Sequence, residues 1–173
     1  RIDKDTAGLV LFSVDPASRD AYQSLFRQRV VSKVYEAWAP VMPERVFPLT
    51  CACRLAAADE FFRTAVIAGE PNSETRVDVL ERRGAWARYQ LQPVTGRKHQ
   101  LRVHMAHLGA PILHDRWYPH VRSGDGDPFG SPLQLLAKSL AFVDPLSGEA
   151  RYFESRQRLL AEPERAASQS ICN

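Results

Sequence analysis

The chain is poor in cysteine and has no long hydrophobic run, and each of these features excludes a class of protein. Three cysteines among 173 residues are too few, and odd in number, for a disulfide framework, so the composition favours a reducing compartment. The longest unbroken apolar run, from Gly8 to Phe12, is far too short to span a bilayer. No secretory signal is recognisable. We therefore expect a cytoplasmic protein that is not inserted in a membrane.

The common motifs for cofactors and metals are also missing. The sequence has no G-x-G-x-x-G, no G-x-x-x-x-G-K-[ST] and no H-E-x-x-H. Cys51 and Cys53 are separated by one residue and have no second cysteine pair nearby, which argues against a structural zinc site. We interpret His99 and His104 as hydrogen-bonding or packing residues. The sequence therefore predicts neither a metal nor a cofactor.

The charge balance is only weakly basic, with 23 Lys and Arg against 20 Asp and Glu. This net charge of +3 does not by itself indicate a nucleic-acid-binding protein. The distribution is more informative, because the stretch from Arg76 to His104 holds seven basic and two acidic residues. The basic surplus therefore lies in the middle of the chain.

The pattern of apolar residues predicts an α+β protein with a mixed, largely antiparallel sheet and flanking helices. We expect a domain over residues 1–160 and a polar C-terminal tail over 161–173. Several segments are expected to be strands: 8–14, 30–39, 60–68, 74–80, 86–91 and a hairpin of 140–143 with 150–153. Amphipathic helices are expected over 16–29 and 97–108, a loop over 119–132, and either a helix or a strand over 133–140.

A polar segment with two carboxylates precedes the first apolar run. Asp3 lies between Arg1 and Lys4, whose positive charges favour the ionised form of its carboxyl group. An ionised carboxylate that is held rigidly can attack a sugar anomeric carbon. Asp3 and Asp5 are also typical of residues that only form a turn. The spacing alone favours this second interpretation.

The segment Thr95–His104 carries the most chemical information. Backbone N–H groups at its helix start, together with Arg97 and Lys98, would suit a phosphate group. Arg102 could face a cleft and bind a carboxylate through two nitrogens. The alternative is a solvated basic helix face, and the sequence leaves both open. Tyr35, on a strand, could likewise stack on a base or pack in the core.

Several segments together resemble the RluA-type pseudouridine synthases. Arg1–Gly8 (R-I-D-K-D-T-A-G) is similar to the family's R-L-D-x-x-T-S-G, and Lys33–Ala37 (K-V-Y-E-A) to K-x-Y-x-A. Thr95–His104 (T-G-R-K-H-Q-L-R-V-H) and Leu108–Asp115 (L-G-A-P-I-L-H-D) are similar to T-G-R-x-H-Q-L-R-x-H and L-G-x-P-I-x-G-D. The hairpin Phe142–Glu149 also resembles the family's closing segment. The match covers nearly the whole chain.

The resemblance implies the pseudouridine synthase catalytic fold and the isomerisation of uridine to pseudouridine in structured ribosomal or transfer RNA, without cofactor or metal. It implies that Asp3 is the catalytic aspartate, that Tyr35 packs against the target base, and that Arg102 pairs with Asp3. Base flipping is required, because a stacked uridine hides its anomeric carbon. The oligomeric state is not readable, and a monomer is the expectation. The RNA-binding residues would be Arg1, Lys4, Thr6, Arg97, Lys98, His99 and Gln100.

The chain departs from the family pattern in a few places. Ile2 replaces Leu, Ala7 replaces Ser, and His114 stands where the family has Gly. The catalytic aspartate of this family lies well inside its domain, so we expect the fold of this chain to be N-terminally incomplete. Two other functions stay open at this point. One is a non-catalytic RNA-binding domain with the same fold, and the other is a glycoside hydrolase that uses Asp3 and Asp5.

Overall fold

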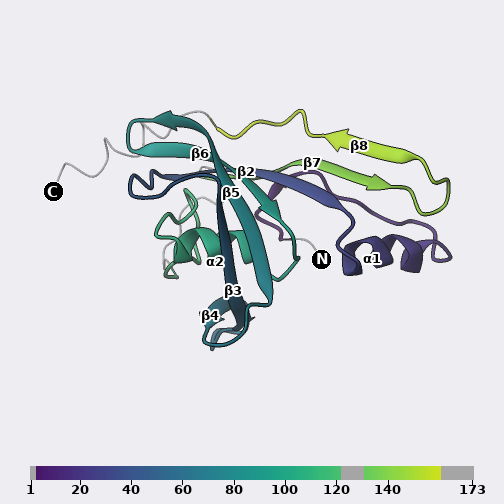
Figure 1. Ribbon diagram of the computed structural model, residues 1–173, viewed down its shortest axis with the longest axis horizontal. Helices are drawn as coiled ribbons and strands as arrows, with labels where there is room; N and C mark the ends of the chain where they lie inside the picture. The colour runs from purple at the N-terminus through teal and green to yellow at the C-terminus, as the bar shows by residue number, and fades with distance from the viewer. Residues whose placement is uncertain (1–2, 122–130, 161–173) are drawn as a thin grey trace.

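A mixed sheet runs through the molecule, and two helices lie beside it at separate places (Figure 1). The computed structural model describes residues 3–121 and 131–160. Within these residues the chain forms, in order, β1 (Ala7–Gly8), α1 (Arg19–Arg27), β2 (Ser32–Pro40), β3 (Leu49–Ala57), β4 (Thr64–Ile67), β5 (Ser73–Arg83), β6 (Trp86–Pro93), α2 (Gln100–His107), β7 (Leu135–Val143) and β8 (Ala150–Glu154).

The strand order is β1-β7-β2-β6-β5-β3-β4, and β8 pairs with β7 beside β1. Only the short β1–β7 pair is parallel, and the other pairs in the described part of the chain are antiparallel. The predicted α+β class and the mixed, largely antiparallel sheet are therefore confirmed. The hairpin predicted from residues 140–143 and 150–153 is also present as the β7–β8 pair.

The core forms where the alternating strands meet α2. Ala87, Tyr89 and Leu91 on β6 are fully buried, as their period of two predicts. They pack with Leu101 and Met105 from α2, which repeat at helical spacing. This packing fixes α2 against the sheet, and α2 carries the arginine of the third sequence motif.

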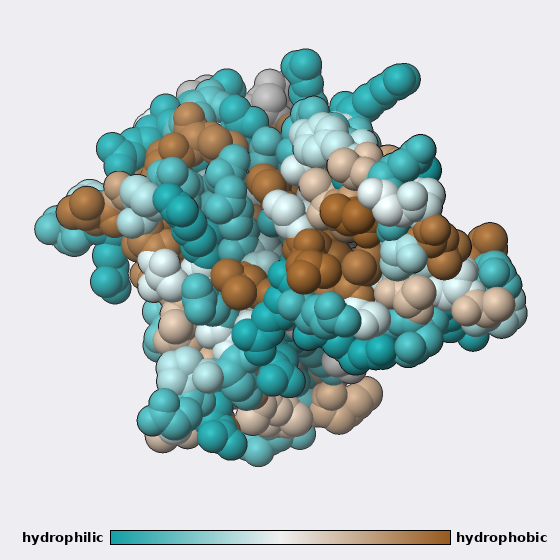
Figure 2. Space-filling view, turned by 45° about the vertical axis from the view of Figure 1, so that its right-hand side comes forward, coloured by the Kyte–Doolittle hydropathy of each residue, from teal (hydrophilic) through white to brown (hydrophobic). Residues whose placement is uncertain are grey.

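The expected buried strand over 8–14 is wrong, because regular pairing with β7 ends at Gly8. Leu9 still donates its N–H to the Ala137 carbonyl, but the following side chains are largely exposed, with Val14 at 92%. Leu11, Phe12 and Val14, with Phe142 and Phe153 of the β7–β8 hairpin, help to line a groove of about 570 Å³. Figure 2 shows hydrophobic patches at the surface on this side of the molecule. A continuous apolar run therefore did not identify a buried strand here.

Two other segments differ from the sequence-based expectation. The strand β3 was not predicted, because three prolines precede it at positions 40, 43 and 48. Its side chains nevertheless alternate, with Cys51, Cys53 and Leu55 buried. The strand expected over 60–68 is shorter, because residues 60–63 form a turn before β4. The segment 133–140, predicted as a helix or a strand, contributes to β7. The expected tail over 161–173 lies outside the described residues, as does part of the expected 119–132 loop.

The sheet register aligns the first two sequence motifs. Gly8 of β1 and Tyr35 of β2 both lie opposite Ala137 of β7, one on each side. Gly8 has a φ of +99°, and a Cβ at this position would lie 2.3 Å from the Ala137 carbonyl oxygen. Only glycine allows this close approach. The turn that carries Asp3 is therefore anchored to the sheet through β1. The strand β7 lies between β1 and β2, which carries Tyr35.

Candidate active site

A buried arginine organises the candidate site. Arg102 lies in the first turns of α2, and its side chain is 1% exposed. Its Nε and Nη2 donate to Oδ2 and Oδ1 of Asp115 at 2.8 and 2.7 Å. Asp115 is fully buried and also accepts the backbone N–H groups of Trp117 and Tyr118. This two-nitrogen pairing fixes the plane of the guanidinium group.

The remaining terminal nitrogen of Arg102 faces the N-terminal motif. Nη1 donates to Oδ1 and Oδ2 of Asp3 at 3.2 and 3.0 Å, across 99 residues of sequence. Asp5 Oδ2 lies 3.4 Å from the same nitrogen. The predicted approach of Asp3 and Arg102 is therefore confirmed. The predicted binding of a carboxylate through two nitrogens is also confirmed, but the partner is Asp115, and Asp3 is held through Nη1 alone.

Burial and charge act in opposite directions on this arginine. Burial by itself lowers the pKa of Arg102, but its hydrogen bonds to Asp115 and the charges of Asp115 and Asp3 raise that pKa above its ordinary value. Arg102 is therefore a permanent cation surrounded by three carboxylates. Asp115 is enclosed, whereas the Asp3 side chain is 17% exposed. Asp3 is thus both held by the arginine and accessible from outside.

Local backbone geometry places both carboxylates. The Asp3 side chain accepts the N–H of Asp5, and the Asp3 carbonyl accepts the N–H of Thr6, so residues 3–6 form a turn. The turn-forming interpretation of these aspartates is thus correct as far as it goes, but the turn also aims them at Arg102. His114, just before Asp115, has a φ of +63°. Glycine is favoured at such a position, so the loop keeps a glycine-like conformation with histidine in it.

Aromatic rings extend from the arginine toward the surface. The Arg102 guanidinium carbon lies 4.7 Å from the centre of the Trp117 ring. Phe62 contacts Trp117, with ring centres 5.3 Å apart, and Phe61 contacts Phe62 at 5.5 Å. Phe61 is 87% exposed. These rings form an apolar path from the charged centre to solvent, and sequence patterns had not singled out Phe61 or Phe62 as site residues.

The basic residues of the third motif lie around this path. The ring of His99 contacts Trp117, and its Nδ1 is 2.9 Å from the Tyr118 hydroxyl. Burial lowers the pKa of His99, and the charge of Asp3 opposes that shift, so the ring is neutral at neutral pH. The ammonium group of Lys98 donates to the Phe61 carbonyl. Arg97 is exposed, and its Nε donates to a backbone carbonyl at 3.2 Å.

Gln100 has a structural position that does not fit its predicted contact with RNA. Its side chain is buried, and its Oε1 accepts from the Thr95 hydroxyl and the Arg97 N–H. Its Nε2 donates to the Glu74 carbonyl and to the Thr75 hydroxyl. All of its polar atoms therefore have partners inside the protein. Gln100 builds the bend before α2, and this bend presents its neighbours at the surface.

The other predicted site residues are placed as follows. Tyr35 is half-buried on β2 against the core, and burial raises the pKa of its hydroxyl. Thr6 is half-buried and Lys4 is exposed, both within or beside the Asp3 turn. Arg1 lies outside the described residues. Asp115 is the main addition to the predicted set, and the need of a buried arginine for a buried counter-charge could have identified it.

Comparison with known proteins gives a consistent family. The sequence model described as RNA pseudouridylate synthase matches residues 1–107. A dual-specificity RNA pseudouridine synthase RluA of Haemophilus influenzae is 31% identical over 170 residues, which cover 90% of this chain and 71% of the relative. The Escherichia coli protein of the same name is 32% identical over 159 residues, covering 90% of this chain and 70% of the relative.

A solved structure supports the fold independently. The human RNA pseudouridylate synthase domain containing 1 protein superimposes with a TM-score of 0.73 and 23% identity, over 98% of this chain and 77% of the human chain. In the described part of the chain, no helix has the length and apolar character needed to cross a membrane. The sequence match and the superposed fold agree, and the chain belongs to the RNA pseudouridylate synthase family.

Proposed function

We propose that this protein isomerises uridine to pseudouridine in structured RNA, with Asp3 as the catalytic carboxylate. One observation carries the proposal: the accessible Asp3 carboxylate is held by Arg102, which is itself fixed by Asp115. A carboxylate whose position is set in this way needs little reorganisation when it reacts. The family membership and the names of the RluA relatives support the same reaction.

The reaction needs no external reagent. The bond between N1 of the base and C1′ of the ribose breaks, and a bond between C5 and C1′ forms. C5 loses its proton and N1 gains one, so atoms and charge balance within one nucleotide and solvent. Asp3 opens and re-forms the link between ribose and base, and the sequence leaves open whether it attacks the sugar or the base. Arg102 holds the carboxylate in a fixed position through its Nη1 hydrogen bonds.

Tyr35 would contact the target base from β2. It pairs with the same residue of β7, Ala137, as Gly8 does from the other side, and this shared register supports the assignment. Because burial raises the pKa of its hydroxyl, Tyr35 is a neutral phenol at neutral pH. Its direct contribution is therefore packing and hydrogen bonding, and removal of the C5 proton would require a further acceptor for that proton.

The substrate would be ribosomal or transfer RNA in the cytoplasm. The exposed aromatic path offers stacking surfaces for an unpaired base, and Arg97 and Lys98 beside it suit phosphate groups. Arg1, Lys4, Thr6 and His99 would contact the nucleotide or its neighbours. The two described cysteines are free thiols, which agrees with a reducing compartment.

The test uses RNA that carries tritium at C5 of uridine, incubated with the full chain. We expect tritium release to water and pseudouridine in the product, and we expect Asp3→Asn and Asp3→Ala to abolish both while RNA affinity stays. Asp20→Asn is the matched control, because Asp20 is an exposed carboxylate on α1 whose side chain is 84% exposed. It should leave turnover unchanged.

Three outcomes separate the alternatives. RNA binding without tritium release would favour the non-catalytic RNA-binding domain. Release of free uracil would favour a hydrolase that uses Asp3 with Asp5. Full turnover by Asp3→Ala would reject Asp3 as the catalytic residue, whatever the reaction.

A further inference from the structure

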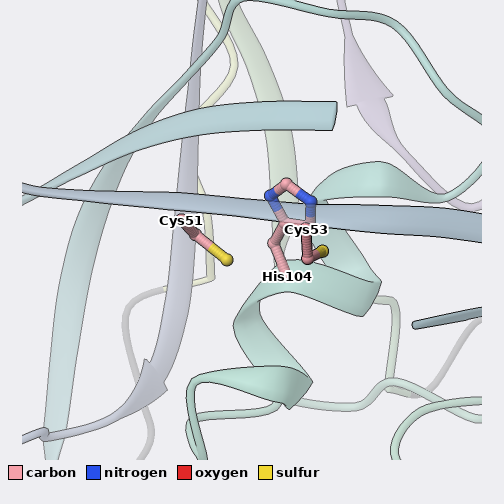
Figure 3. Close-up of side chains that lie close together, drawn as sticks. All are labelled: Cys51, Cys53 and His104. Atoms are coloured by element: carbon pink, nitrogen blue, oxygen red, sulfur yellow. The ribbon is translucent and has the colours of Figure 1, made fainter. Parts of the chain in front are cut away.

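Two cysteines and a histidine that the proposed reaction does not use meet in the interior. Cys51 and Cys53 are two residues apart on β3, so their side chains point to the same face of the sheet. His104 comes from α2, which packs on that face (Figure 3). Both sulfur atoms and one ring nitrogen of His104 lie within 4.8 Å of one another, and all three residues are buried. Within the described residues, two thiol sulfur atoms and one imidazole nitrogen thus form a buried group that could bind a metal ion.

The hydrogen bonds around His104 assign its tautomer. The Ser73 hydroxyl donates its single proton to the Cys53 carbonyl at 2.7 Å. The same hydroxyl oxygen lies 2.9 Å from Nε2 of His104, so Nε2 carries a hydrogen and donates to it. Nδ1 is then the nitrogen with a free lone pair, and it is buried without a hydrogen-bond partner among the residues that the structure describes. An unpaired acceptor in the interior is costly and calls for a ligand.

We propose that Cys51, Cys53 and His104 bind a thiophilic metal ion, and that Cu⁺ is the ion that fits them best. Thiolate sulfur and imidazole nitrogen select soft ions such as Cu⁺, or Zn²⁺. Structural zinc sites have four protein ligands, and zinc sites with three keep a position for water. The cluster supplies three ligands in a buried pocket, and Cu⁺ is stable with three. Each thiol that binds gives its proton to solvent, and the metal is not oxidised or reduced.

The surroundings of His104 match those of a metal-binding imidazole. Metal-bound histidines generally donate the other ring N–H to an oxygen, which fixes the orientation of the ring. Ser73 on β5 already supplies that oxygen. A bound ion would therefore join β3 to α2, while Ser73 joins the same imidazole to β5. Because α2 also carries Arg102, the ion would hold the helix that positions Asp3.

The test measures metal binding directly and does not depend on the proposed RNA chemistry. The full chain carrying Cys172→Ser keeps the cluster and removes the third cysteine of the sequence. This reduced protein is titrated under anaerobic conditions with Cu⁺ supplied as its bicinchoninate complex, and in parallel with Zn²⁺. We expect uptake of one Cu⁺ per chain and a rise in melting temperature as Cu⁺ is added. Zn²⁺ should bind more weakly.

Substitutions then locate the ion. Cys51→Ala and Cys53→Ala, each in the Cys172→Ser background, should weaken Cu⁺ binding by more than about 100-fold, beyond the 10–100-fold that loss of an outer hydrogen-bond partner costs. Ser73→Ala should fall within that smaller range. Circular dichroism checks that each variant is folded. X-ray absorption of the loaded Cys172→Ser protein, which needs no cluster variant, should show two sulfur atoms and one nitrogen on copper.

Several results would overturn the proposal. One is the absence of Cu⁺ uptake by the folded Cys172→Ser chain. Another is equal uptake by folded Cys51→Ala, and a third is an absorption spectrum without sulfur ligands. Tighter binding of Zn²⁺ than of Cu⁺ would reject the choice of ion. A failure of the tritium-release experiment would leave this proposal unaffected.

Discussion

At the scale of single residues, the three donor nitrogens of Arg102 have different tasks. Nε and Nη2 are committed to Asp115, and Nη1 holds Asp3. Asp115 is itself fixed by two backbone N–H groups, so the guanidinium group cannot rotate to follow Asp3. The position of the Asp3 carboxylate is therefore set through a chain of contacts that begins in the loop after α2. An ammonium group has no planar fork and could not satisfy both carboxylates in this geometry.

Replacing Arg102 by lysine should preserve the positive charge but remove the planar arrangement of donors that binds both carboxylates. We expect Arg102→Lys to lower kcat by about 100-fold, the effect of a small misplacement of a reacting group, with a smaller change in KM. We also expect a loss of about 1–3 kcal/mol in unfolding free energy, because Asp115 loses a buried hydrogen-bond partner. Tritium-release kinetics and urea unfolding measure the two effects.

The control for this change is Arg27→Lys on α1. Arg27 also pairs with an aspartate, at 2.9 Å, but its side chain is 57% exposed. An exposed ion pair contributes little, so kinetics and stability should stay at the level of the unchanged protein. If Arg102→Lys turned over RNA as fast as that control, the fork geometry would have no catalytic role.

At the scale of elements, the two-residue strand β1 connects the turn that carries Asp3 to the sheet. Its partner β7 approaches so closely at Gly8 that a side chain there would meet the Ala137 carbonyl. The turn over residues 3–6 follows the position of this strand, because the turn leads directly into Ala7. A substitution at Gly8 should therefore displace Asp3 without direct contact between the two residues.

Gly8→Ala tests this connection. We expect a loss of about 1–3 kcal/mol in unfolding free energy, from the positive φ and from displacement of β1, together with slower tritium release. Gly84→Ala is the matched control, since Gly84 has a φ of +55° but no atom within 4 Å of the added Cβ. It carries the cost of the backbone conformation alone. Equal turnover in the two variants would show that β1 does not position the turn that carries Asp3.

The elements that the sequence predicted well are those with clear periodicity. β6 and the β7–β8 hairpin follow a period of two or an obvious turn, and α2 follows a period of 3.6. The segment 8–14 failed because a short apolar run has no period that could indicate which side is covered. β3 was missed because nearby prolines suggested a loop, although Cys51, Cys53 and Leu55 alternate correctly. The period of apolar residues thus identified elements with one buried face. It failed where nearby prolines or a continuous apolar run hid the alternation of buried and exposed residues.

At the scale of the whole molecule, the site could be predicted only in part. The resemblance brought Asp3, Tyr35 and Arg102 to attention, and Asp3 and Arg102 do meet. Which carboxylate binds both Nε and Nη2 of Arg102 depends on how the loop after α2 folds back. The spacing of residues in the sequence does not indicate this. The same holds for His104, whose position beside Cys51 and Cys53 exists only after α2 packs on β3. Contacts between elements therefore account for what the sequence left undetermined.

The electrostatics of the whole molecule give a last prediction. The net charge is only +3, so RNA binding should depend on a few local phosphate contacts, such as one made by Arg97. Each such contact releases counterions and steepens the fall of affinity with salt. Arg97→Gln should therefore reduce the slope of log K against log salt by about 0.7–0.9. Arg27→Gln, on α1, should leave the slope unchanged. Binding of an RNA substrate measured over a series of KCl concentrations gives these slopes, and an unchanged slope in Arg97→Gln would remove this residue from the RNA interface.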